Sequence, residues 1–148
     1  MEPSPEDIGI VREWFVAFKK SPPRNWLHRV FCRRGFTHCY LMGFDRRSGF
    51  GVTLETLFWK TEIRIVTSAE LDVIVPMAIQ QGQVLVYRAP PHPVSEFHRH
   101  FSCVGIVCHI LGIRSKWVFS PSRLYQELKR LGAVELRDGN SACRWHIS

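Results

Sequence analysis

A turn between two apolar runs constrains the fold more than any other feature of the sequence. The runs occupy residues 35–44 and 50–58, and the turn sequence DRRSG separates them at 45–49. Gly49 can take the positive φ that a tight turn requires. Two runs of strand length around a short turn predict an antiparallel hairpin, and the alternating residues 62–66 predict a further strand. We therefore expect an antiparallel sheet that other elements must cover.

A helix and a strand are expected after this sheet. The sequence Thr-Ser-Ala-Glu at residues 67–70 forms a capping box before an apolar run, which predicts a helix over 69–81. Pro76 should kink this helix, and Gly82 should close it. The apolar residues 84–87 then predict a buried strand.

Two more helices are expected nearer the C-terminus. The first is headed by Cys103 and ends at Gly112, in the run FSCVGIVCHILGI. The second is capped and started by Ser120-Pro121, and Gly132 stops it. Its predicted core face consists of Leu124, Leu128 and Leu131.

The two ends of the chain complete the expected fold. Residues 6–19 place apolar side chains at helical spacing and predict an amphipathic helix. The tail from 133 to 148 predicts a hairpin about Asp138-Gly139-Asn140. This order of elements predicts an α+β fold with a mostly antiparallel sheet packed against helices. The 148 residues suggest one domain, made of the N-terminal helix and basic connector (1–33), a core (34–132) and the C-terminal hairpin (133–148).

Positive charge is concentrated near the N-terminus. The chain has a formal net charge of +7, and the segment from Arg12 to Arg34 contains seven Lys or Arg residues with only Glu13 as an acidic residue. Such a segment can contact nucleic acid or an acidic protein partner. The alternative is a solvated basic face without a partner.

The cysteines and the N-terminus bear on the compartment. The five cysteines are an odd number at scattered spacings with no CxxC pair, so free thiols are expected. The first ten residues are acidic and interrupted by proline, unlike a signal peptide. No apolar run approaches the roughly 20 residues of a membrane span. We expect a cytoplasmic protein that makes no membrane contact.

Cys103 is the first candidate for chemistry. The thiolate is the reactive form of cysteine, and it is stabilised at a helix N-terminus by the unpaired backbone N–H groups there. A nucleophilic cysteine also needs a base, which can lie far away in the sequence. The alternative is that Cys103 is an inert core residue, as we expect for Cys108 further along the same helix.

His38 and Glu55 are the candidates for the base and for the group that orients it. His38 lies in a strand that otherwise reads as core, and Glu55 is a carboxylate within the apolar run GVTLETLFW. A pair between them would satisfy two polar groups that are costly to bury alone. Each also has a plain alternative, because a strand histidine can be satisfied locally and Glu55 can face water. His98 and His100 compete with His38 for the role of base, but they lie in an expected loop.

A zinc site is a further alternative. His38, Cys39, Cys103, Cys108 and His109 are residue types that bind zinc. Adjacent strand residues such as His38 and Cys39 point to opposite faces, however, and a spacing of five on a helix is unfavourable. We therefore expect neither a metal nor another cofactor.

The stretches that carry these residues resemble a known group of proteins. They are FTHCYLMGFD, a second strand with a carboxylate in its middle, and FSCVGIVCHILGI followed by SPSRLYQELKRLGA. Together they resemble small papain-like proteins encoded by tailed bacteriophages. These look like circularly permuted relatives of NlpC-type peptidases and lecithin-retinol-acyltransferase-like enzymes, in which the histidine strand precedes the cysteine helix. The resemblance covers roughly residues 34 to 132.

The resemblance implies roles for individual residues. Cys103 would be the nucleophile, His38 the base, and Glu55 the polar third residue on the next strand. The backbone N–H of Cys103 would contribute to an oxyanion hole. Tyr87 is a candidate second donor, with a core tyrosine as its alternative. Retinol-acyltransferase-like members carry asparagine directly before the cysteine, whereas this chain has Ser102, which argues against lipid acyl transfer.

Two functions follow as expectations. The first is a papain-like thiol hydrolase or acyltransferase that acts on an amide or ester, such as a phage-encoded cell-wall peptidase. The second is a non-catalytic virion structural or accessory protein on the same scaffold, with its basic N-terminal region meeting nucleic acid or an acidic partner. Either would work in the bacterial host cell or in the virion.

Overall fold

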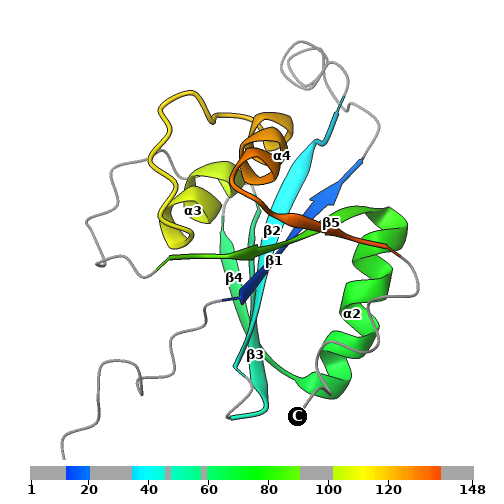
Figure 1. The fold of residues 1–148 in the computed structure, drawn as a ribbon. Coiled ribbons are helices and arrows are strands. Elements are labelled where there is room, and N and C mark those ends of the chain that lie inside the picture. The colour runs from blue at the N-terminus through cyan, green and yellow to red at the C-terminus, as the bar shows by residue number, and fades with distance from the viewer. Residues whose placement is uncertain (1–12, 21–34, 46–47, 58–59, 91–101, 138–148) are drawn as a thin grey trace, which may run out of the picture.

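The computed structural model describes residues 13–20, 35–45, 48–57, 60–90 and 102–137, which form a six-stranded antiparallel sheet and three helices (Figure 1). The predicted α+β class is confirmed. The strands are β1 (Glu13–Lys19), β2 (His38–Asp45), β3 (Phe50–Thr56), β4 (Thr61–Thr67), β5 (Gly82–Arg88) and β6 (Val134–Leu136). The helices are α2 (Ser68–Gln81), α3 (Cys103–Ile110) and α4 (Pro121–Arg130).

The strands are ordered β4-β3-β2-β1-β5-β6 across the sheet, and each neighbouring pair is antiparallel. The predicted hairpin is confirmed as β2 and β3, joined by a turn in which Gly49 has φ +73°. The predicted third strand is β4. The strand expected at 84–87 is β5, which lies beside β1 near the other edge of the sheet.

The helix predicted over residues 6–19 is wrong for the part that the structure describes. Residues 13–19 form β1, at the centre of the sheet between β2 and β5. A central strand is covered on both faces, so its sequence is a continuous apolar run rather than an alternating one. The run from Phe15 to Phe18 is fully buried, and its spacing from Trp14 to Phe18 fits a helix by coincidence. Residues 6–12 lie outside the described part of the chain.

Two hydrophobic clusters hold the layers together, one on each face of the sheet. Alternate residues of β1 divide between them. Val16 and Phe18 pack with α3 and α4, whereas Phe15 and Ala17 pack with α2. Figure 1 shows the same arrangement, with α2 on one side of the sheet and α3 and α4 on the other. The sheet is therefore the middle layer.

The helix α2 follows the predicted capping box closely. The backbone N–H of Glu70 donates to the Thr67 hydroxyl (3.3 Å), and the Glu70 carboxylate accepts from the Thr67 backbone N–H (2.7 Å). The helix is continuous through Pro76 and ends at Gly82. Its buried face consists of Leu71, Val75 and Ala78.

Serine residues begin both helices on the other face. The Ser102 hydroxyl accepts from the backbone N–H of Gly105 (3.0 Å) at the start of α3, and the Ser120 hydroxyl accepts from that of Arg123 (3.3 Å) at the start of α4. Leu124 and Leu128 are buried, as predicted.

Leu131 is a correction, because it is 40% exposed. It follows the last residue of α4 and no longer obeys the helical period. The tail then pairs with β5 through β6, whereas the predicted turn at 138–140 lies outside the described residues.

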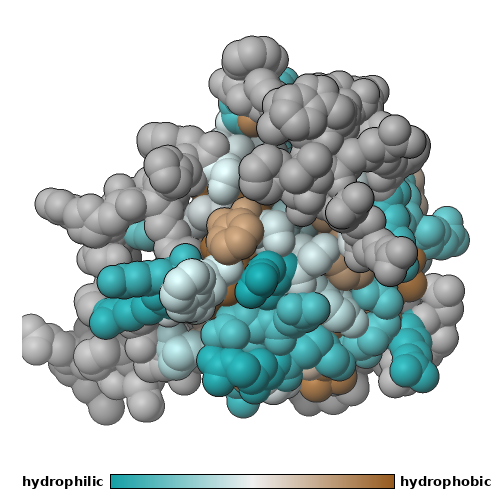
Figure 2. Space-filling view, turned by 90° about the horizontal axis from the view of Figure 1, so that it is seen from above, coloured by the Kyte–Doolittle hydropathy of each residue, from teal (hydrophilic) through white to brown (hydrophobic). Residues whose placement is uncertain are grey.

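Seen from above, the described surface is mostly hydrophilic, with isolated hydrophobic side chains (Figure 2).

Candidate functional site

Cys103 is the first residue of α3, and its side chain reaches the start of β2. Ser102 caps the helix, so the chain turns into α3 immediately before the thiol. Backbone N–H groups in the first turn of a helix have no partner within that helix. Cys103 is half-buried and packs against the cluster that contains Cys39. The sequence prediction that Cys103 heads a helix is confirmed.

The start of β2 is open toward β3. The ladder between these strands begins at the pair Leu41–Leu54, so His38 and Cys39 lie before it. On the other side, β2 pairs with β1 from His38 to Gly43, and His38 stands opposite Lys19. The opening brings the Cys103 sulfur within hydrogen-bonding reach of the Cys39 backbone.

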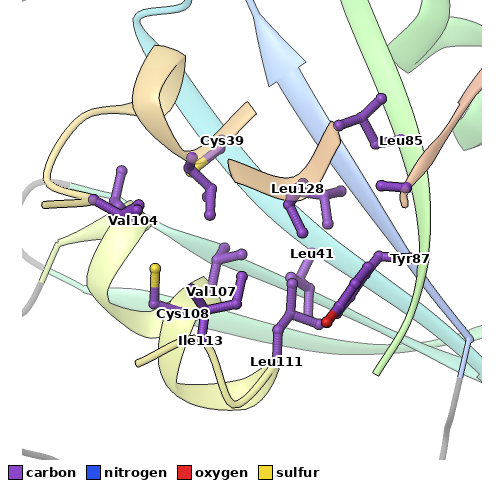
Figure 3. Close-up of a cluster of buried hydrophobic side chains, with 14 of the residues drawn as sticks. Cys39, Leu41, Leu85, Tyr87, Val104, Val107, Cys108, Leu111, Ile113 and Leu128 are labelled. Carbon is purple, nitrogen blue, oxygen red and sulfur yellow. The ribbon is translucent and has the colours of Figure 1, made fainter. Parts of the chain in front are cut away.

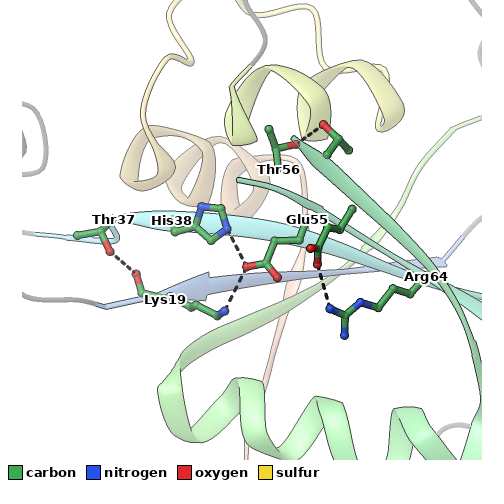
Figure 4. Close-up of polar contacts among 8 residues, drawn as sticks. Lys19, Thr37, His38, Glu55, Thr56 and Arg64 are labelled. Atoms are coloured by element: carbon green, nitrogen blue, oxygen red, sulfur yellow. Dashed lines mark hydrogen bonds and ion pairs between the residues drawn. The ribbon is translucent and has the colours of Figure 1, made fainter. Parts of the chain in front are cut away.

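His38 and Glu55 form the predicted pair. His38 Nε2 lies 3.1 Å from Glu55 Oε1 (Figure 4), and both side chains are about three-quarters buried, with exposed fractions of 23% and 29%. The His38 side chain also makes a hydrogen bond to Cys103. Since Nε2 faces the carboxylate, Nδ1 is the ring nitrogen left for the thiol. The three predicted site residues therefore lie in one connected chain of contacts.

Lys19 also contacts Glu55. Its Nζ lies 3.2 Å from the same Oε1 atom that His38 approaches. The Lys19 ammonium is 4.8 Å from the centre of the Tyr40 ring, and the His38 ring stacks on Tyr40 with centroids 6.4 Å apart. Lys19 on β1 thus contacts the carboxylate, and Tyr40 on β2 stacks against the imidazole.

The pKa values of the thiol and the imidazole move in opposite directions. Hydrogen bonds from Cys39 and His38 and the charge of His38 outweigh burial, and the pKa of Cys103 falls to about 4. Burial alone would lower the pKa of His38. The hydrogen bond to Cys103 and its charge, followed by the charge and hydrogen bond of Glu55, outweigh burial and raise this pKa. Between these two pKa values the site holds a thiolate and an imidazolium. This is the protonation state in which cysteine is nucleophilic.

Cys39 is the second thiol of the site. Its hydrogen bond to Cys103 and its burial raise the pKa of Cys39 well above the usual range. It therefore keeps its proton and donates S–H to the Cys103 sulfur, while its backbone N–H donates to the same atom. The two cysteines differ in protonation because one is fully buried and the other receives the hydrogen bonds. None of Cys39, Cys103 and Cys108 forms a disulfide.

Two other candidates lie away from this constellation. Cys108 is buried in the cluster between the sheet and α3 (Figure 3), as expected for a core cysteine. Tyr87 belongs to the same cluster, and its hydroxyl points toward Leu111 at the far end of α3 from Cys103 (Figure 3). The core alternative for Tyr87 is therefore the correct one.

Several sequence candidates lie outside the described residues. These are His98 and His100, and most of the basic segment that runs from Arg12 to Arg34. Within the described ranges, no group of three or more His, Cys, Asp or Glu residues is placed to hold a metal ion. No helix there is long and apolar enough to cross a membrane.

Sequence reasoning missed Lys19 and Cys39. The sequence predicts a helix over Lys19, which gives no sign of its position opposite His38. The rule that neighbouring strand residues point to opposite faces argues against a joint role for His38 and Cys39. That rule holds in the middle of a sheet, but Cys103 lies at the open start of β2 and contacts both residues. A cysteine directly after the candidate base was the available signal.

Comparison of the chain with protein families, with curated proteins and with solved structures gave no match.

Proposed function

We propose that the protein is a thiol hydrolase or acyltransferase with a circularly permuted papain-like arrangement, acting on an amide or an ester. One observation carries the proposal: the connected chain from Cys103 through His38 to Glu55, with the thiol pKa lowered and the imidazole pKa raised. The order of the elements supports it, because the histidine strand precedes the cysteine helix. Perturbed pKa values of a paired thiol and base are typical of catalytic sites.

The reaction begins with attack of the Cys103 thiolate on the substrate carbonyl carbon. A C–S bond forms, and the carbonyl oxygen becomes an oxyanion that the backbone N–H of Cys103 can stabilise. The His38 imidazolium gives its proton to the leaving amine or alcohol as the C–N or C–O bond breaks. The products of this step are a thioester on Cys103 and neutral His38.

The second half of the reaction restores the thiolate. Neutral His38 removes a proton from water, or from an acceptor alcohol or amine, as its oxygen or nitrogen attacks the thioester carbon. The C–S bond breaks and the acid, ester or amide leaves. Glu55 accepts the Nε2–H bond throughout and keeps the imidazole oriented. Lys19 contacts the same carboxylate oxygen from β1.

A peptide amide, including a cell-wall peptide, is the substrate class that we propose. A phage-encoded enzyme of this kind would meet the wall after lysis or as part of the virion. The alternative that the scaffold serves as a non-catalytic virion or accessory protein, with a basic surface for nucleic acid or an acidic partner, makes the opposite prediction for thiol chemistry.

Trapping of the thioester tests the proposal. A purified preparation mixed with a p-nitrophenyl ester and quenched in acid should gain the mass of one acyl group, and peptide mapping should place it on Cys103. Cys103→Ala should gain none, while Cys108→Ala should behave as the wild type. No acyl adduct, or an adduct that persists in Cys103→Ala, would favour the non-catalytic alternative.

A further inference from the structure

Among the residues that the structure describes, no strand pairs with the outer edge of β4. It is last in the strand order and pairs with β3 over seven consecutive residues without a bulge. Natural edge strands are usually protected by proline, by charged side chains, by bulges or by covering segments, and the charges of β4 are one acid and one base, Glu62 and Arg64. The sequence of β4, TEIRIVT, contains no proline. Ile63 and Ile65 are 66% and 77% exposed, and no helix or strand of the described residues covers them.

The two faces of β4 carry different chemistry. Ile63 stands opposite Leu54, whose side chain packs against the cluster under α3, so the isoleucines point to that face. Glu62 and Arg64 point to the opposite face, where they form an ion pair of 2.9 Å (Figure 4). The strand therefore has an apolar stripe on one face and an acid and a base, two residues apart, on the other.

We propose that β4 is a dimerisation edge, on which a second copy of this chain adds its own β4 in antiparallel orientation with the twofold axis at Ile63. This register places the two Ile63 residues opposite each other. It also places Glu62 of each copy opposite Arg64 of the other, so both cross-strand charge pairs are attractive. The contact is isologous and closes after two copies. It is independent of the proposed function.

The charges of Glu62 and Arg64 favour this register over registers in which the second β4 is shifted along the first. A shift by one residue would move the isoleucines to the wrong face. Of the two nearest registers that keep the faces matched, one places Glu62 opposite Glu62, and the other places Arg64 opposite Arg64. Like charges directly opposite each other destabilise a strand pair. Of these three registers, only the one centred on Ile63 pairs opposite charges.

Charge reversal tests the proposal on the full-length chain. Sedimentation equilibrium should show the wild type in a concentration-dependent equilibrium between monomer and dimer. Arg64→Glu places four acidic groups at the twofold contact, and Glu62→Arg places four basic ones. Each variant alone should weaken the dimer by roughly ten-fold or more, because both cross-strand pairs become repulsive.

An equimolar mixture of the two variants supplies the sharpest test. In the mixed dimer each glutamate of one chain faces an arginine of the other, so dimerisation should return. Attraction between the net charges of the two variants does not explain such a rescue. The wild type has a formal net charge of +7, and each substitution changes it by two, so the variants carry +5 and +9 and repel each other overall. Val134→Lys, at the exposed opposite edge of the sheet, should leave the dimer intact. A monomeric wild type, or failure of the mixture to dimerise, would overturn the proposal.

Discussion

His38→Ala is expected to slow ester or amide hydrolysis by roughly 10²- to 10⁴-fold, the usual contribution of a general acid–base group. The variant loses the proton donor for the leaving group and the imidazolium that stabilises the thiolate. The pKa of Cys103 should rise at the same time, since the hydrogen bond and charge of His38 help to lower it. Steady-state hydrolysis of a p-nitrophenyl ester, with alkylation of Cys103 as a function of pH, measures both effects.

His109→Ala is the matched control for this variant. His109 lies near the end of α3, whereas the thiol lies at its start, so its loss should leave both quantities near the wild-type values. Glu55→Gln should fall between the two variants, because the amide can still contact Nε2 but lacks the charge that favours the imidazolium. Hydrolysis by His38→Ala at the wild-type rate would contradict the role of His38 as the base.

Cys39→Ala is expected to raise the pKa of Cys103 by more than about one unit, through loss of a hydrogen bond to the thiolate. The Cys39 thiol is the largest single contribution to the low pKa of Cys103. Cys39→Ser retains a short side chain with a hydroxyl donor and should keep the Cys103 pKa low. The measurement is the pH midpoint of Cys103 alkylation in each variant.

Two controls separate the loss of the Cys39 hydrogen bond from a general effect on the core. Cys108→Ala removes a thiol from the same apolar cluster and should leave the midpoint of Cys103 unchanged. Circular dichroism should show that Cys39→Ala is folded, because Cys39 is fully buried and its truncation leaves space in the core. Equal midpoints in Cys39→Ala and Cys39→Ser would show that the donor at position 39 is unimportant.

The elements with local signals were predictable from the sequence. The capping box at Thr67 and Glu70 defines the start of α2, and Ser120-Pro121 defines that of α4. The hairpin of β2 and β3 follows from two apolar runs around a glycine turn. Each of these signals lies within a few residues of the structure that it specifies, so no knowledge of tertiary contacts is needed.

The strand β1 was not predictable in the same way. Its buried run fits a helix as well as a central strand, and only its neighbours β2 and β5 decide between them. The error also hid Lys19, which contacts Glu55 only because β1 lies beside β2. The contact of Cys39 with Cys103 likewise depends on where the β2–β3 ladder begins, which is a property of the assembled sheet.

The site therefore depends on three distant parts of the chain. Residues on β2 supply the imidazole and a thiol donor, β3 supplies the carboxylate, and α3 supplies the Cys103 thiol at its first turn. The sheet fixes the first two, and the packing of α3 on the same cluster fixes the third. Rigid elements hold a group of side chains more accurately than loops do, which is the reason that the sequence favours His38 over His98 and His100.

The ionisation of Cys103 in the wild-type protein tests the central claim most directly. The rate of its alkylation by iodoacetamide, followed by mass spectrometry of the peptide that contains Cys103, should rise with pH through a midpoint at about 4. This result would mean that the site holds a thiolate at neutral pH. A midpoint near the ordinary thiol value of about 8.5 would mean that Cys103 is a plain core cysteine, and would contradict the account.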